Sequence, residues 1–513
     1  MTSWFILGNI LALNLFTMPM TTTQPISVVW STDVATQVIY LDTPSKAELY
    51  WSPVAYWSPT ANEMLISDYN SATTFTDYII LKANAPEFEL THLLTQPVNS
   101  LTNFGAQWSP DGQQIVYFDP FLTRMNRDGS HITAINPDLQ VFRENDSFTG
   151  WVGNDIFVYN VYTGGGSNQA IFVDIFSGQY MDFRQGLRLL PHSNNNYVAF
   201  SSYDMRYASM GPVVFTMPTQ LTGTVAYTTP SYFIQHDWIE NYHKFDVNPE
   251  TLEPYHEINV VALPRGWLTN SNQLLFTSNS NERQISLSNP QLRSIEIFTE
   301  THQLMLWDLD THEAKVLVAN AVDGLFSPDG TVLAYLSFFP QKHPMTETLA
   351  FTTTHIISFY LQLLNMSTKQ VTLSSPVSTQ IWYSFDSGRA IDISFSPDSR
   401  YLLYYTPERF LVDSHNTVYL NLLDLQTNTV IFSTLSTQSI TDYLPLWSPN
   451  GRQFIYPDIH GNWHSYHVAD SKIVSITQQG GINLRQPHWS FDGRYVSFYD
   501  TLKHQIAILT MPQ

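Results

Sequence analysis

The sequence predicts an all-β fold, and three observations carry that prediction. A hairpin phrase, clear as "QWSPDGQQIVYF" from Gln107 to Phe118, returns many times along the chain. Two further strand-like runs follow most copies, and amphipathic helical patterns are nearly absent. A unit that repeats every few tens of residues is typical of solenoids, propellers and related arrays.

The phrase itself predicts a tight hairpin. Ser109, Pro110, Asp111 and Gly112 are residue types that a type I turn favours or tolerates at its four successive positions. Proline presets φ, aspartate bonds the backbone ahead of it, and glycine relieves the exit of the turn. The following run Ile115–Phe118 is β-branched and aromatic, as in a strand buried on both faces.

The same phrase places one bulky residue just before each turn. Six clear copies do so, and we expect their bulky residues to occupy equivalent sites between neighbouring units: Trp57, Trp108, Phe326, Phe395, Trp447 and Trp489. Three weaker copies start at Trp151, Pro191 and Trp267. With the additional strand pair, each unit has four strands, which is the blade of a β-propeller.

At this level the chain resembles the TolB-like propellers, which are built from WD40-like PD40 repeats with this Trp-Ser-Pro-Asp-Gly hairpin. The resemblance covers nearly the whole chain from about Ser27, and it implies fold more than activity. We expect a single closed propeller of four-stranded blades. Eight blades are predicted, with seven to nine open, because nine candidate hairpins are present and a long interval separates Pro191 from Trp267.

Both ends of the chain enter the predicted ring. The final unit, from Trp489, stops after its third strand, and the segment that starts at Ser27 supplies a suitable strand to complete it. Closure by this N-terminal strand would remove an exposed sheet edge. We therefore divide the chain into residues 1–24, an apolar N-terminal segment and linker, and residues 25–513, the propeller.

Composition limits the function classes. The net charge of −21 argues against nucleic acid and anionic lipid as partners. No cysteine is present, so disulfides and thiolate chemistry are excluded. Charged residues make up only 13% of the chain, and the abundance of uncharged polar residues favours an exported protein.

The N-terminus supports the same expectation of an extracytoplasmic protein. The run from Trp4 to Met20 is apolar, although it lacks a basic residue before it and a clear cleavage site after it. We read it as an export signal or uncleaved anchor, with a packed N-terminal segment as the alternative. A membrane contact is expected only through this run.

Catalytic signals are sparse. The chain has no G-x-S-x-G elbow. Gly164–Ser167 reads as a loop between strands and not as a phosphate cradle, and Asp308 and Asp310 as turn acids. His460, His464 and His467 cluster in sequence, but on an extended strand the first two would face one way and the third the other. No cofactor, metal site or catalytic residue is predicted.

The interval from Tyr203 to Glu257 breaks the repeat and concentrates aromatic and histidine residues. Loops that depart from a rigid repeat are where binding function gathers, and aromatic side chains supply binding energy. An irregular blade whose aromatics pack inward is the alternative reading. The predicted binding residues are Tyr232, His236, Trp238, Tyr242, His243 and Tyr255.

Two function classes follow. The preferred one is a non-enzymatic binding or scaffold propeller that engages a protein partner or a neutral glycan through loops of the ring face. The alternative is a propeller enzyme, a polysaccharide lyase or glycosidase with its site at the channel mouth. The oligogalacturonate lyase-like propellers carry these repeats too. The net charge of −21 disfavours a lyase that acts on an acidic sugar, because protein and substrate would repel each other.

Overall fold

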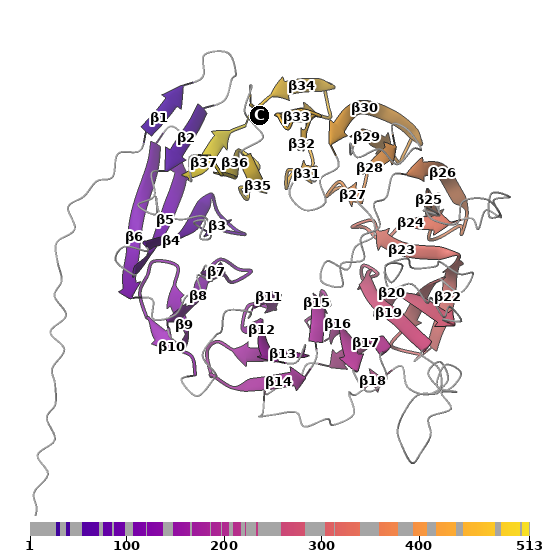
Figure 1. The fold of residues 1–513 in the computed structure, drawn as a ribbon, viewed down its shortest axis with the longest axis horizontal. Helices are drawn as coiled ribbons and strands as arrows, with labels where there is room; N and C mark the ends of the chain where they lie inside the picture. Colours follow the sequence, from indigo (N-terminus) through magenta and orange to yellow (C-terminus); the bar gives the residue numbers. More distant parts are fainter. Residues whose placement is uncertain are drawn as a thin grey trace, which may run out of the picture.

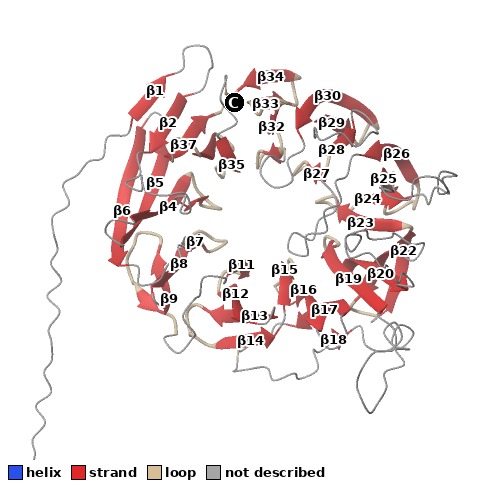
Figure 2. Cartoon of the chain, viewed as in Figure 1, coloured by secondary structure: helices blue, strands red, loops and turns tan. Residues whose placement is uncertain are grey.

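The structure is a computed structural model. It describes residues 27–30, 37–41, 54–70, 75–84, 87–97, 106–119, 121–136, 147–164, 167–184, 186–195, 197–204, 209–216, 221, 232–233, 258–282, 303–311, 313–338, 359–377, 393–407, 417–437, 445–477, 484–502 and 505–511. Strands and turns make up these residues, and no helix occurs among them (Figure 2). Within the same residues, no helix long and apolar enough to cross a membrane was found.

The sheets follow one another around a common centre (Figure 1). In each four-stranded sheet the first strand in the sequence is innermost and the last is outermost. The first three four-stranded sheets contain β3 (Val54–Trp57), β4 (Glu63–Asn70), β5 (Phe75–Asn84) and β6 (Glu87–Pro97); β7 (Gln107–Trp108), β8 (Gln114–Asp119), β9 (Phe121–Asn126) and β10 (Thr133–Ala134); and β11 (Ser147–Val152), β12 (Ile156–Gly164), β13 (Ser167–Asp174) and β14 (Tyr180–Arg184).

Three more four-stranded sheets lie in the second half of the chain. They contain β23 (Ala321–Phe326), β24 (Val332–Phe338), β25 (Phe359–Asn365) and β26 (Val371–Val377); β27 (Ile393–Phe395), β28 (Tyr401–Pro407), β29 (Thr417–Asp424) and β30 (Thr429–Thr437); and β31 (Leu446–Trp447), β32 (Gln453–Pro457), β33 (Trp463–His467) and β34 (Lys472–Ser475). Neighbouring strands in all six sheets are antiparallel, as expected for strands joined by short turns.

One larger sheet holds eight strands. They are β15 (Gly186–Pro191), β16 (Tyr197–Asp204), β17 (Ser209–Thr216), β18 (Tyr232–Phe233), β19 (Ile258–Trp267), β20 (Gln273–Glu282), β21 (Gln303–Asp308) and β22 (Glu313–Ala319). Its two halves meet through one parallel residue pair, Met210 with Val261. Strand β18 pairs with the outer side of β17 and thus takes the place of a fourth strand in the first half.

The last sheet combines both ends of the described chain. Strands β35 (Leu484–Trp489), β36 (Tyr495–Asp500) and β37 (Gln505–Thr510) are followed by β2 (Gln37–Leu41) and β1 (Ser27–Trp30). Strand β2 pairs antiparallel with β37 over four residue pairs, from Val38 with Leu509 to Leu41 with Ile506. The N-terminal strands therefore continue the sheet of the last repeat.

All nine predicted hairpins are formed, each between the innermost strand of a unit and the next strand. Five of their turns share one side-chain hydrogen-bond pattern, centred on Ser109, Ser327, Ser396, Ser448 and Ser490. Ser109 Oγ donates to Asp111 Oδ1 at 2.6 Å and accepts the backbone N–H of Gln114 at 2.9 Å. Gly112 has φ +66°, and its N–H donates to the Ser109 carbonyl. The serine is fully buried, so this pattern holds the turn from inside.

The predicted equivalence of the six bulky residues is confirmed. Each packs into a cluster that combines side chains of two successive sheets. Five of them are only 5–8% exposed, and Trp57 is half-buried. Packing between sheets, in a chain without disulfides, is thus the main source of stability.

A ladder of indole hydrogen bonds runs between these sheets. Each indole N–H donates, at 2.9–3.2 Å, to a backbone carbonyl on the innermost strand of another unit: Trp57 to His488, Trp108 to Tyr56, Trp267 to Leu190, Trp447 to Ser394 and Trp489 to Leu446. The acceptor always belongs to the residue directly before the bulky position of the preceding unit. The ladder therefore fixes how each innermost strand lies against the one before it.

Candidate functional site

The binding residues predicted from sequence fall mostly outside the described residues. Tyr232 lies in β18, where its backbone pairs with Val214 of β17. His236, Trp238, Tyr242, His243 and Tyr255 lie outside the described residues. Within the described residues, the interval predicted to break the repeat contributes β17 and the two-residue strand β18, and the binding prediction remains a prediction.

The histidine-rich stretch is part of a turn and a strand, which corrects the expectation of one extended segment. His460 lies in a turn that Asp458 closes by accepting the backbone N–H groups of His460 and Asn462, at 2.8 and 2.9 Å. Strand β33 begins only at Trp463, so His460 and His464 do not share a strand face.

His464 joins Asp458 and Ser475 in one hydrogen-bonded cluster. Its Nε2 lies 3.2 Å from Asp458 Oδ2, and its Nδ1 lies 3.2 Å from Ser475 Oγ. Burial raises the pKa of Asp458, but hydrogen bonds from Asn462, His464 and His460 outweigh it and leave that pKa below its ordinary value. This carboxylate already accepts four hydrogen bonds, so the cluster is explained by the turn that it stabilises.

The two turn acids behave as predicted. Asp308 Oδ1 accepts the backbone N–H groups of Asp310 and Thr311, and its Oδ2 accepts the Gln273 amide at 2.6 Å. The Gln273 bond is the main cause that lowers the pKa of Asp308. No group of three or more His, Asp or Glu side chains among the described residues is arranged to hold a metal ion.

The innermost strands provide a different candidate. The residue just before each bulky residue is half-buried in eight units, as at Tyr56, Gln107 and Ser394. His488 of β35 is the exception because it is exposed. Within the described parts of the innermost strands, only β35 exposes polar side chains: Arg485, Gln486 and His488.

The innermost strands β11, β15, β19 and β23 also contain register shifts, so what distinguishes β35 is the conformation of a residue within its bulge. The pairing of β35 with β36 shifts between Arg485 and His488, which inserts one extra residue into the inner strand. Gln486 has φ +52°, a left-handed conformation that disfavours a residue with a Cβ by about 1–2 kcal/mol. Bulges next to functional sites redirect side chains, and strained backbone gathers at such sites. The strained Gln486 and the exposed polar side chains beside it thus mark β35 as a candidate site.

The bulge lies where the last repeat meets the first. The rings of His488 and Tyr56 are 6.3 Å apart in an edge-to-face arrangement, and the His488 carbonyl accepts the Trp57 indole N–H at 3.1 Å. Although the imidazole is exposed on one side, the surrounding protein desolvates it and lowers the pKa of His488. We call the group Tyr56, Trp57, Arg485, Gln486 and His488 the seam.

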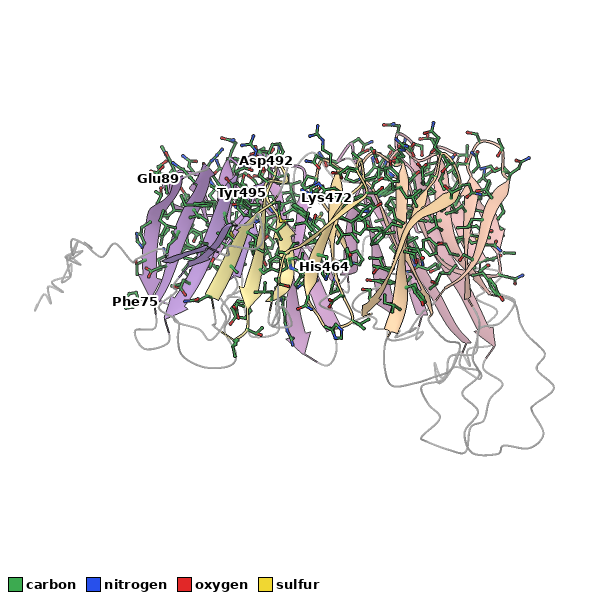
Figure 3. The ribbon with its side chains drawn as sticks, turned by 90° about the horizontal axis from the view of Figure 1, so that it is seen from above. Phe75, Glu89, His464, Lys472, Asp492 and Tyr495 are labelled. Carbon is green, nitrogen blue, oxygen red and sulfur yellow. The ribbon has the colours of Figure 1, made fainter. Side chains whose placement is uncertain are left out.

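One face of the ring carries the repeated turns, and we call it the turn face. Figure 3 shows Asp492 of the last turn at this edge, and Phe75 at the opposite edge. The second residue of each clear turn is exposed there: Pro59, Pro110, Pro328, Pro397, Pro449 and Phe491. Each of these residues follows a buried serine of its turn.

Sequence reasoning missed the seam. The available signal was "RQPHW" from Arg485 to Trp489, where histidine stands directly before the bulky residue. The bulge itself could not be predicted from the sequence, because its residue at positive φ is glutamine and not a glycine or asparagine, which adopt such a φ more readily.

Comparisons with known proteins give fold neighbours but no family. No protein-family model matches the chain, and no curated protein matches it. Similar solved structures are β-propellers. The C-terminal WD40 domain of Sif2 is 11% identical, with 90% of this chain and 96% of that chain covered and a TM-score of 0.43. An oligogalacturonate lyase from Vibrio parahaemolyticus is 9% identical, with 95% and 97% covered and a TM-score of 0.36.

A third neighbour is the β-propeller domain of the Trilobed protease from Pyrococcus furiosus. It is 13% identical, covers 46% of this chain and 62% of that chain, and has a TM-score of 0.28. We rest neither the fold nor an activity on likeness this distant. The fold rests on the hydrogen-bonded sheets and their arrangement around one centre (Figure 1).

Proposed function

We propose that this protein is a non-enzymatic binding propeller that holds a protein partner or a neutral glycan. The observation that carries the proposal is β35, which presents exposed polar side chains on a strained bulge and is alone in exposing polar side chains among those that the structure describes on the innermost strands. Backbone strain persists only where the surrounding structure enforces it, and it concentrates where ligands are held. The indole ladder supplies that enforcement, because it fixes the strands on both sides of the bulge.

The segment from Tyr227 to Tyr255 is proposed as a second contact. Its support is its composition: Trp238 and Tyr242 are aromatic residues of the kind that dominate binding energy at interfaces. By chain order the segment lies between β17 and β19, on either side of the two-residue strand β18.

The detailed architecture belongs to the same proposal. We propose a closed ring that β2 completes by pairing with β37, as a member of the TolB-like class. The division of the described strands into eight sheets supports the eight blades expected from the sequence. The single residue pair between β17 and β19 supports counting the eight-stranded sheet as two blades, which would give nine.

We also propose that the protein works outside the cytoplasm, on the basis of the apolar run at its N-terminus and its uncharged polar composition. Cell fractionation and N-terminal sequencing test this. A protein that is found in the cytoplasm and still begins at Met1 would contradict it.

Binding without turnover separates the proposal from the enzymatic alternative. The full chain is incubated with neutral oligosaccharides and with extracellular proteins from its source, and the bound species is recovered and analysed by mass spectrometry. The proposal expects saturable binding and a chemically intact ligand, weakened at least tenfold in Trp238→Ala or Tyr242→Ala if the second contact is used. Recovery of an unsaturated sugar or of new reducing ends would instead establish a lyase or glycosidase.

A further inference from the structure

We propose that the seam is a subsite for one residue of a neutral saccharide. The inference deepens the proposed function, on which it rests, by naming the ligand class and the place where it binds. The residues that support it are Tyr56, Gln486 and His488.

The seam offers an aromatic surface beside hydrogen-bonding groups. Tyr56 is half-buried, and its ring meets the edge of the His488 ring at 6.3 Å. Sugar recognition uses such surfaces, because an aromatic face packs against the C–H groups of a pyranose while polar neighbours bind its hydroxyls. Gln486 carries both a donor and an acceptor, and a neutral imidazole does too. These are the groups that a ring of hydroxyls requires.

The ligand is inferred to be uncharged because Arg485, the one cationic residue of the seam, already has a partner within the protein. Desolvation by its surroundings lowers the pKa of His488 and so favours the neutral imidazole. A carboxylated sugar would need an available cation here.

The backbone on both sides is fixed before a ligand arrives. The Tyr56 carbonyl accepts the Trp108 indole at 3.1 Å, and the His488 carbonyl accepts the Trp57 indole at the same distance. The Trp57 indole also lies 3.0 Å from Ser497 Oγ and stacks on Tyr495 with 6.0 Å between ring centroids. Preorganisation of this kind lowers the entropy lost on binding.

Five neutral probes test the subsite: the hexasaccharides of cellulose, chitin, mannan, xylan and starch. Binding to the full chain is measured by isothermal titration calorimetry. We expect at least one probe to bind saturably, and His488→Ala and Gln486→Gly each to weaken it tenfold or more. Gln486→Gly is compatible with the positive φ, so it is expected to fold and to isolate the loss of the amide.

Gln107→Ala is the matched control. Gln107 occupies in its unit the position that His488 occupies in the last one, directly before the bulky residue, but lies outside the seam. Its substitution is expected to leave the dissociation constant within twofold of that of the unchanged protein. Circular dichroism and denaturation midpoints confirm that each variant is folded.

The outcomes separate this inference from the proposed function. If a probe binds but neither seam variant weakens it, the seam assignment is overturned and the binding function stands. If none of the five probes binds, the saccharide assignment is overturned, and an intact protein partner recovered from the extracellular proteins would still support the function. If a bound probe is cleaved, the non-enzymatic function is overturned whatever the seam variants do.

Discussion

The indole nitrogen of Trp57 donates to the backbone carbonyl of His488 at 3.1 Å, which joins residues 431 positions apart in the chain. The same bond in other units connects successive repeats, as from Trp489 to the Leu446 carbonyl. The last repeat therefore supplies the acceptor for Trp57, just as the preceding repeat supplies it for the other tryptophans. The contact between the first hairpin and the last is made by the same chemistry as the contacts along the ring.

Replacing tryptophan with phenylalanine tests the ladder, because it removes the indole N–H and keeps an aromatic ring. The Trp447 indole N–H has one acceptor, so we expect Trp447→Phe to lower the free energy of unfolding by about 1 kcal/mol. Trp57→Phe is expected to lose more, because the Trp57 indole N–H has two acceptors, the His488 carbonyl and Ser497 Oγ. Equilibrium denaturation in guanidinium measures both. Equal, negligible losses would show that the indole bonds contribute nothing to stability.

Truncation of the same kind of residue tests packing between sheets. Trp447 is 7% exposed and lies among side chains of β28, β29 and β32. We expect Trp447→Ala to lower the free energy of unfolding by about 3–5 kcal/mol. The control is Phe176→Ala, whose side chain is 53% exposed, with an expected change below about 0.5 kcal/mol. Similar effects of the two substitutions would contradict the buried role of the repeated bulky residue.

Two glycines of the repeated turn offer a matched pair. Gly112 and Gly451 have φ +66° and +69°, so alanine strains both alike, by about 1 kcal/mol. At Gly112 the added Cβ would also collide with Thr60 Oγ1 of the neighbouring turn, whereas at Gly451 its nearest neighbour is Pro397 Cδ at 3.5 Å. Gly112→Ala is therefore expected to destabilise the protein by roughly 1–2 kcal/mol more than Gly451→Ala.

A second substitution shows whether contact with Thr60 is the cause. Thr60→Gly in the Gly112→Ala background removes the colliding hydroxyl and should recover most of the additional loss. Thermal denaturation of the two single variants and the double variant provides the comparison. If the two glycine variants lose equal stability, the neighbouring turns do not approach each other as the structure shows.

The local parts of this fold were predictable from the sequence because local chemistry determines them. Ser109, Asp111 and Gly112 specify a hairpin without reference to the rest of the chain. The acceptor of each indole was not predictable, because it depends on which strand precedes the tryptophan in space. Strand β18 was missed for a similar reason, since Tyr232 and Phe233 pair as a strand only against β17.

The candidate site was the least predictable part. A bulge at Gln486 arises where β35 and β36 fall out of register, and no residue with a preference for positive φ marks it. The predicted binding residues were chosen for aromatic composition in an irregular interval, and composition alone does not tell a contact surface from a packed strand.

We expect the protein to lose stability in mild acid, and the first cause is His488. Desolvation lowers the pKa of His488 in the folded protein, and likewise that of His467, from the ordinary value of 6.5. Between that value and the folded pKa, the unfolded chain binds more protons than the folded protein. The free energy of unfolding must therefore fall as the pH drops below 6.5.

Carboxylates add a second decline at lower pH. The folded pKa values of Asp329, Asp424 and Asp458 lie below the ordinary 3.8, since hydrogen bonds to the charged form outweigh burial. Their stabilisation is complete above 3.8 and is lost as the pH falls through the folded values. Guanidinium midpoints between about pH 7.5 and about pH 3 should thus fall in two stages. His488→Gln should reduce only the first stage of the decline. Asp458→Asn should reduce only the second stage, and it should also lower the stability at neutral pH because it removes the hydrogen bonds that the carboxylate accepts. A first stage unchanged in His488→Gln would show that the imidazole is not desolvated at the junction of the last repeat with the first.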